Sequence, residues 1–282
     1  MKKHLIPALS LSLCLGLAAC SGGGTTTPSA PPAPSSSPVP SESAAVETSA
    51  AESATIHVFA AASLTEALTQ IGENYKAVAP NITVTFTFDS SGILQKQIEQ
   101  GAECDLFLSA AQKQMNALFD EKYIDESTRT DLLENKVVLT VPEGNPAGVT
   151  AFEDVNTDKV KLVALGNSDV PVGQYAEELY TTLGIWDDIQ SKITFGSNVK
   201  EVTTWVSEGT VDCGVVYATD AHSAGLQVVS EADPALLSNK VVYPAAVLSA
   251  SAHADAAKAF LDYLTSADSV AVFQSVGFAM AS

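Results

Sequence analysis

The sequence predicts an α/β protein made of two lobes. From about residue 55 onward, strand-like runs of apolar and β-branched residues alternate with amphipathic helical patterns. Such alternation is typical of parallel strands joined by helical crossovers, and here it occurs in two successive series. The body is also longer than one modest domain requires. We therefore predict two lobes, each with a mixed, mostly parallel sheet flanked by helices, and a ligand cleft between them.

The first twenty residues indicate a targeting segment. Lys2 and Lys3 precede an apolar run at 5–17, which is too short for a stable membrane-spanning helix. The run ends in Leu-Ala-Ala-Cys at 17–20, which resembles the bacterial lipoprotein signal, whose cysteine is lipidated and becomes the mature N-terminus. We expect residues 1–20 to be a signal peptide and Cys20 to anchor an extracytoplasmic protein to the cell membrane.

Residues 21–54 are mainly Ser, Thr, Pro, Gly, Ala and Glu. With almost no large apolar side chain they cannot bury enough surface to fold, so we expect a disordered tether. About 34 flexible residues would span roughly 30 Å.

The chain is strongly acidic, with 14 basic and 33 acidic residues and a net charge of −19. Loss of a signal containing Lys2 and Lys3 would make it more negative still, so nucleic acid is excluded as a partner. A small anion is not excluded, because long-range fields are screened within roughly 8 to 10 Å and local dipoles can prevail in a cleft.

Cys104 and Cys213 are the cysteines left in the folded body, since Cys14 and Cys20 belong to the signal. A bridge between them is possible outside the cell. Because both begin strands in different segments, two buried free thiols are the favoured interpretation.

The order of the predicted elements defines the lobes. Expected strands are 55–62, 82–88, 104–110, 136–141, 161–165, 193–195, 213–217 and 241–248. Expected helices are 63–79, 92–100, a segment ending at 119, 174–183, 200–208 and the segments from 254 onward. We assign 55–136 and 241–282 to one lobe and 137–240 to the other.

Four strand-to-helix junctions are the most informative local feature, at Ser63 and within 89–92, 170–173 and 196–199. Each places a helix N-terminus at the carboxyl end of a strand, where free amides and the helix dipole can bind an anion without Lys or Arg. Ser63 with Glu66 also fits an ordinary capping box. Strand ends that face each other across a cleft would bring the four junctions together.

The junctions are built of Ser, Gly, Val, Asn and Pro, with Lys200 as their one basic residue. Neutral hydroxyl and amide donors suit a compact, fully deprotonated oxyanion. A metal cation would find no carboxylate or imidazole shell there, and His57, His222 and His253 lie in unrelated motifs, so we expect no cation site.

Six segments in order carry a resemblance to a known family: 58–65 (VFAAASLT), 88–94 (FDSSGIL), 101–110 (GAECDLFLSA), 170–176 (VPVGQYA), 198–200 (NVK) and 214–221 (GVVYATDA). In this combination the chain resembles the extracytoplasmic molybdate-binding proteins of ABC transporters. The resemblance spans the body from residue 55 to 278.

The resemblance implies a type II periplasmic-binding-protein fold that closes on a tetrahedral oxyanion. It implies a receptor without enzymatic activity or cofactor, which captures molybdate, and also tungstate, and delivers it to a membrane permease. The sequence gives no sign of self-association, so we expect a monomer. Carried over by motif, Ser63 and Ser91 supply hydroxyl and amide donors from one lobe. Val172 and Val199 supply backbone amides from the other lobe, and Tyr217 its phenol.

Two departures from the family concern Val172, where alanine is usual, and the turn at 166–169, which is one residue shorter and lacks its usual proline. Valine is acceptable if only its amide contributes, whereas a side chain that crowds the cavity would displace the ligand. Asp89 is expected to point away from the cleft, and Ser90 is the alternative donor to Ser91. Glycine at 92 and 173 predicts close backbone approach.

Two other functions fit parts of the sequence. A receptor for another oxyanion, such as sulfate, fits the same donors, whereas protonated phosphate would need an acceptor. A serine hydrolase would rest on residues 221–225 (AHSAG), a near match to the nucleophile elbow with alanine in place of its first glycine and Ser223 as nucleophile.

Overall fold

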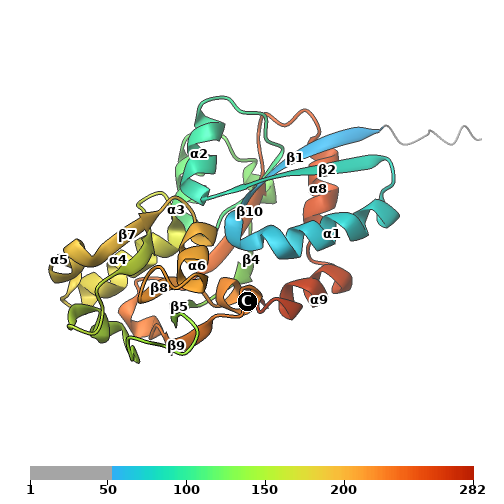
Figure 1. Ribbon diagram of the computed structural model, residues 1–282. Helices are drawn as coiled ribbons and strands as arrows, with labels where there is room; N and C mark the ends of the chain where they lie inside the picture. Colours follow the sequence, from blue (N-terminus) through green and yellow to red (C-terminus); the bar gives the residue numbers. More distant parts are fainter. Residues whose placement is uncertain (1–52) are drawn as a thin grey trace, which may run out of the picture. The chain divides into compact units, whose positions relative to one another are not determined.

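The computed structural model describes residues 53–282, which belong to one compact unit (Figure 1). The predicted signal peptide, Cys20 and nearly all of the predicted tether lie outside the described residues. Ala54, predicted as the last tether residue, instead begins strand β1, where its amide donates to the carbonyl of Asn81. Within 53–282, no helix has the length and apolar character needed to cross a membrane.

The first lobe is built on a six-stranded mixed sheet with the order β11-β4-β10-β3-β1-β2. β1 runs parallel to β2 and β3, whereas β10 runs antiparallel to β3 and β4. The strands are β1 (Ala54–Ala61), β2 (Ile82–Asp89), β3 (Leu106–Leu108), β4 (Thr130–Glu134), β10 (Val242–Val247) and β11 (Ala279–Met280).

Helices cover both faces of this sheet because its central strands are apolar on both sides. On one face, Phe59 and Phe107 pack with Leu94 of α2 and Met115 of α3. On the other face, Ile56, Val58 and Ala60 belong to the main hydrophobic core, which α1 and α8 cover. The helices are α1 (Thr65–Val78), α2 (Ser91–Glu99), α3 (Gln112–Asp120), α8 (Ala254–Tyr263) and α9 (Ala267–Ser275).

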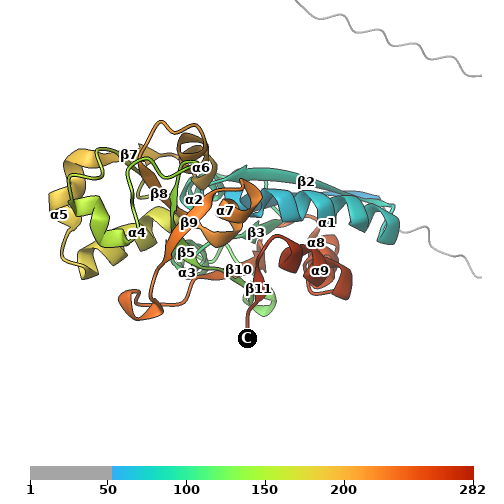
Figure 2. The ribbon, with the colours of Figure 1, turned by 60° about the horizontal axis from the view of Figure 1, so that its bottom comes forward.

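The second lobe is built on a five-stranded sheet with the order β7-β6-β8-β5-β9. Its strands are β5 (Val137–Val141), β6 (Val163–Gly166), β7 (Ile193–Gly196), β8 (Cys213–Tyr217) and β9 (Gln227–Glu231). Its helices are α4 (Pro171–Thr182), α5 (Trp186–Ile189), α6 (Val199–Ser207) and α7 (Ala218–Ser223). In Figures 1 and 2 this lobe, with α4 and α5, lies to the left of α1, α8 and α9.

The two sheets share one topology. The order β2-β1-β3-β10-β4 of the first lobe corresponds, strand by strand, to β7-β6-β8-β5-β9 of the second. In both sheets the antiparallel strand, β10 or β5, is the one that follows a crossover from the other lobe. The predicted two-lobed type II α/β fold is therefore confirmed, and the exact lobe boundaries at residues 136 and 240 stay a prediction.

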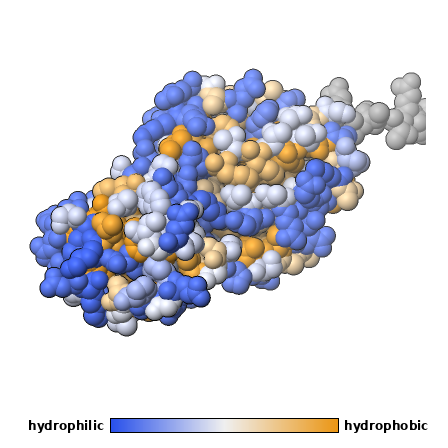
Figure 3. All heavy atoms as spheres, in the orientation of Figure 1, coloured by the Kyte–Doolittle hydropathy of each residue, from blue (hydrophilic) through white to orange (hydrophobic). Residues whose placement is uncertain are grey.

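Four elements of the second half were not predicted as such: the short helices α5 and α7 and the edge strands β9 and β11. β4 of the first lobe was also missed, and the strand predicted at 104–110 shortens to β3. Hydrophilic residues cover much of the face seen in Figure 3, with apolar patches between them.

Both cysteines of the described part are free thiols, as favoured from the sequence. Cys213 is buried, whereas Cys104 is only half-buried. Burial raises the pKa of each thiol to about 12, so both stay protonated at neutral pH.

Candidate functional site

A small cavity lies where the helix N-termini of the two lobes meet. It is narrow in this form of the protein: the space open to the centre of a water molecule is about 10 Å³, and one side faces solvent. The lining residues are Ala61, Ala62, Ser63, Ser90, Ser91 and Ala110 of the first lobe and Val170, Pro171, Val199 and Tyr217 of the second. The fold thus brings together four of the five predicted site residues, and none of the lining side chains carries a charge.

Ser63 lies in a single 3-10 turn, Ala62–Leu64, that joins β1 to α1. The predicted capping box is wrong, because no side chain caps either this turn or α1. Instead the Ser63 hydroxyl oxygen lies 2.9 Å from the phenol oxygen of Tyr243 on β10. Glu66 turns to the other lobe, where it pairs with Lys200.

Ser91 is the first residue of α2 and is completely buried. Its hydroxyl oxygen accepts a 3.0 Å hydrogen bond from the backbone amide of Ala110. Ser90 is the N-cap of the same helix and accepts a 3.3 Å bond from the amide of Ile93. Each hydroxyl oxygen thus accepts a bond from a backbone amide and keeps its own hydrogen as a donor.

Two helices of the second lobe present their N-termini to the same cavity. α6 begins at Val199, after Asn198 as N-cap, and the first amides of a helix have no acceptor within it. α4 begins at Pro171, which has no N–H, so the first amide of that helix belongs to Val172. Val172 itself is fully buried and does not line the cavity, although Val170 and Pro171 do.

Tyr217 ends β8 and reaches across to the first lobe. Its phenol donates a 3.1 Å hydrogen bond to the backbone carbonyl of Ala110. Burial raises its pKa well above the ordinary value for tyrosine, so the phenol is a neutral donor.

The turn at 166–169 contacts the first lobe through Asp169. The Asp169 carbonyl accepts a 2.9 Å bond from the amide of Gly92, and its carboxylate lies 2.6 Å from the ammonium group of Lys96. A Cβ at residue 92 would lie 2.5 Å from that carbonyl oxygen, and one at Gly173 would lie 2.1 Å from the Gly166 carbonyl oxygen. The close approach that these glycines allow is therefore between protein segments.

Asp89 makes a further contact between the lobes. Its carboxylate accepts a 2.7 Å bond from the amide of Ser90 and lies 3.4 Å from the side-chain amide of Asn198, and it does not line the cavity. The carboxylate is therefore held outside the cavity lining by two amide donors, which partly neutralise its charge.

The buried carboxyl of Asp220 and the ammonium group of Lys200 form an ion pair next to Val199 of the site. Lys200 follows Val199 on α6 and lies 2.8 Å from Glu66 of the first lobe and 3.1 Å from Asp220 of its own lobe. Asp220 on α7 is 1% exposed, and neither of its oxygens has a hydrogen bond of good geometry. Desolvation raises the pKa of Asp220 to about 6, although the charge of Lys200 opposes the shift. Sequence reasoning noted Lys200 but missed Asp220.

Other candidates from the sequence lie outside the cavity. Ser223 is exposed at the last position of the short helix α7, so it does not occupy the strand-to-helix turn of a nucleophile elbow. His57, His222 and His253 do not line the cavity. Within residues 53–282, no group of three or more His, Cys, Asp or Glu side chains is arranged to hold a metal ion.

Two α/β lobes of one topology, crossed twice by the chain and closed over a small cavity, define the class of two-lobed solute-binding proteins. The chain belongs to the bacterial extracellular solute-binding protein family, whose profile matches residues 56–279.

Individual relatives agree with this assignment. YvgL of Bacillus subtilis, whose name places it among ABC transporter substrate-binding lipoproteins, is 39% identical over 82% of this chain and 88% of its own. The molybdate-binding protein ModA of Escherichia coli is 37% identical over 81% of this chain and 90% of its own. A solved substrate-binding domain from Clostridium difficile, described as part of a molybdenum ABC transporter, is 40% identical with a TM-score of 0.63, covering 82% of this chain and all of that domain.

Proposed function

We propose that the protein is an extracytoplasmic receptor that captures molybdate, and also tungstate, and delivers it to an ABC permease. The observation that carries the proposal is the cavity itself. Its donors are hydroxyls and helix N-termini with no charged side chain, in a chain 37% identical to the E. coli molybdate-binding protein. Such donors satisfy the oxygens of a fully deprotonated anion.

Each predicted site residue has a proposed role. The hydroxyls of Ser63 and Ser91 donate from the first lobe, and the amides of Val172 and Val199 donate from the second. The phenol of Tyr217 must turn its single hydrogen from the Ala110 carbonyl to the anion. Val172 acts through its backbone alone, which accounts for a buried apolar side chain beside an anion.

Closure of the lobes traps the ligand. The contacts of Asp169 with Gly92 and Lys96, and of Lys200 with Glu66, join the lobes around the cavity. Exclusion of water strengthens every hydrogen bond to the enclosed anion, so the negative net charge of the chain does not prevent binding. The closed form is the one that the permease would recognise.

The remaining features of the receptor are proposals from the sequence. Cys20 carries the lipid anchor, residues 21–53 form the tether that ends where β1 begins, and the protein acts as a monomer without catalytic activity or cofactor. YvgL, which is named as a lipoprotein, supports the anchor.

Thermal unfolding of the purified protein with molybdate, tungstate, sulfate or phosphate tests the proposal. Molybdate and tungstate at about 1,000 times their dissociation constants should each add about 4 kcal/mol of stability. The double variant Ser63→Ala with Ser91→Ala should fold normally and lose this shift. A shift with sulfate but none with molybdate would leave the receptor class intact and overturn the ligand.

A further inference from the structure

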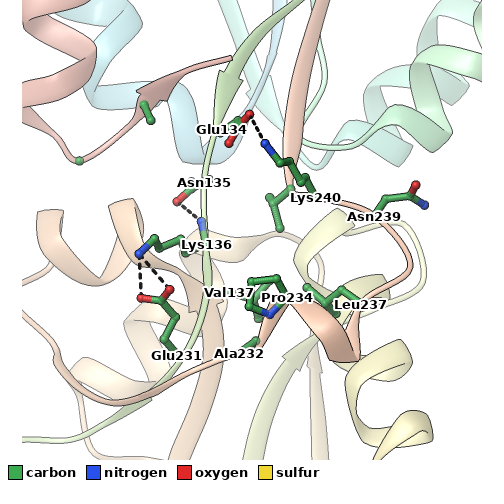
Figure 4. Close-up of a pocket in the computed structure, with 13 residues that line it drawn as sticks. Glu134, Asn135, Lys136, Val137, Glu231, Ala232, Pro234, Leu237, Asn239 and Lys240 are labelled. Atoms are coloured by element: carbon green, nitrogen blue, oxygen red, sulfur yellow. Dashed lines mark hydrogen bonds and ion pairs between the residues drawn. The ribbon is translucent and has the colours of Figure 1, made fainter. Parts of the chain in front are cut away.

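A chain of hydrogen bonds connects the crossover between the lobes to Ser63. Asn135 lies between β4 and β5, where the chain first passes from one lobe to the other; Figure 4 shows it beside Lys136. Its side-chain nitrogen lies 2.9 Å from the hydroxyl oxygen of Thr219 and 3.1 Å from the phenol oxygen of Tyr243. The Tyr243 phenol in turn lies 2.9 Å from the Ser63 hydroxyl in the cavity.

Which group donates in each of these hydrogen bonds follows from the first bond, at Asn135. The side-chain oxygen of Asn135 accepts a 2.8 Å bond from the backbone amide of Lys136, which can only donate. This fixes the orientation of the Asn135 amide, so its NH₂ group donates to both Thr219 and Tyr243. The Tyr243 oxygen then accepts from Asn135. The Tyr217 phenol also contacts Tyr243, and because this bond raises the pKa of Tyr217, Tyr217 is its donor. The single hydrogen of Tyr243 is therefore left for Ser63.

This order of donors and acceptors determines what the Ser63 hydroxyl presents to the cavity. Because Ser63 accepts from Tyr243, its own hydroxyl hydrogen is free to point into the cavity. Ser91 is arranged alike, since its oxygen accepts from the Ala110 amide. Tyr243 is 1% exposed, and burial raises the pKa of its phenol well above the usual value, so it keeps the hydrogen that this direction requires.

We propose that Asn135 and Tyr243 are positioning residues that hold Ser63 as a hydrogen-bond donor toward the cavity, and so select fully deprotonated oxyanions over protonated ones. The inference rests on the proposed function and adds a determinant of specificity located at the interlobe crossover. It predicts that a substitution at Asn135 that reverses donor and acceptor along these hydrogen bonds will turn the Ser63 hydroxyl from a donor to the ligand into an acceptor.

Asn135→Asp makes that reversal with almost no change of shape. An ionised carboxylate accepts from Lys136 as before, but it also accepts from Tyr243, which then has no hydrogen for Ser63. Ser63 must donate to Tyr243 and turn a lone pair toward the ligand. The matched control is Asn239→Asp, which places the same added charge on an exposed residue lining the crossover pocket of Figure 4 and outside the chain.

The test measures dissociation constants at pH 8 for sodium molybdate and sodium phosphate, in the wild-type and Ser63→Ala backgrounds. Asn135→Asp should weaken molybdate binding at least tenfold relative to Asn239→Asp. It should also lower the preference for molybdate over hydrogenphosphate, a ratio that added charge alone leaves unchanged because both ligands are dianions. In the Ser63→Ala background the two aspartate variants should show the same preference for molybdate over hydrogenphosphate within about twofold, as a coupled pair requires.

An equal change of preference in both aspartate variants, or a changed preference with Asn135→Asp that persists without the Ser63 hydroxyl, would overturn the inference. If Asn135→Asp does not fold, Tyr243→Phe provides the same test, since its effect must also vanish in the Ser63→Ala background. Should the wild type bind sulfate instead of molybdate, the proposed ligand fails while the same comparison, made with sulfate, still decides the role of Asn135. Absence of any oxyanion binding by the wild type would overturn both.

Discussion

The backbone amide of Gly92 donates a 2.9 Å hydrogen bond to the backbone carbonyl of Asp169, and this bond joins the two lobes beside the cavity. Any side chain at residue 92 would collide with Asp169, because a Cβ would lie 2.5 Å from the carbonyl oxygen and 2.8 Å from the Cα atom. The closed form therefore requires glycine at this position, although residue 92 lies in the first turn of a helix where alanine is ordinarily preferred.

Gly92→Ala should accordingly separate binding from folding. Without ligand, the stability of the variant should equal or exceed that of the wild type by up to about 1 kcal/mol, because alanine favours the helix. The affinity for molybdate should fall at least tenfold, since the lobes cannot close fully. Urea unfolding and titration calorimetry measure the two effects, and unchanged affinity would show that closure does not need this contact.

The ion pair between Lys96 and Asp169 should contribute modestly to closure. Its side chains are 55% and 30% exposed, so a free energy of about 0.2 to 1 kcal/mol is expected. Lys96→Met should raise the dissociation constant for molybdate about two- to fivefold, mainly through faster release, and less at high salt. Lys76→Met is the matched control, because Lys76 pairs with Glu73 inside α1 and should leave affinity unchanged. If Lys96→Met and Lys76→Met raised the dissociation constant equally, Lys96 would act only through its positive charge and not through its contact with Asp169.

Protonation of the buried Asp220 carboxyl should make the free energy of unfolding depend on pH. Its pKa is raised from 3.8 to about 6, so the folded protein binds this proton more tightly than the unfolded chain does. The resulting stabilisation is full below pH 3.8 and is lost as pH rises through about 6. Relative to Asp220→Asn, the wild type should therefore lose about 3 kcal/mol of unfolding free energy between these limits. Urea unfolding at several pH values measures this difference, and a constant difference would contradict it.

Val172 tests whether a residue at the anion site acts through its amide alone. Val172→Ala removes two buried methyl groups and should lower the free energy of unfolding by about 1 to 3 kcal/mol. The affinity for molybdate should stay within about twofold of the wild type. Val206→Ala, at a buried position on α6 away from the cavity, is the control for stability loss alone. A large change in affinity for Val172→Ala only would show that its side chain shapes the cavity.

Much of the fold could be predicted from the sequence because its strands are short apolar runs that end at Ser, Gly or Asn junctions. β4 and β9 were missed because their sequences, TDLLE and QVVSE, mix polar and acidic residues with too few apolar ones for a strand signal. Each lies beside an antiparallel strand whose packing stabilises it, which no local pattern reveals.

The site could be predicted in part for a related reason. Ser63, Ser91, Val199 and Tyr217 belong to local motifs, so their positions at strand or helix ends followed from the sequence. The partners of Ser63 could not be found in this way. Tyr243 lies 180 residues from Ser63 along the chain and 108 from Asn135, so only the crossing of the chain between lobes brings them together. The capping box failed because the 3-10 turn redirects the Ser63 hydroxyl to Tyr243 instead of to its own helix.

The position of a bound anion tests the central claim most directly. In a crystal of the protein grown with sodium molybdate, anomalous scattering locates the molybdenum atom without reference to the protein density. We predict a single strong peak in the interlobe cavity, with anion oxygens within hydrogen-bond distance of the Ser63 and Ser91 hydroxyls and of the Val199 amide. A peak elsewhere on the molecule, with the cavity closed as it is here and no anion in it, would contradict the account.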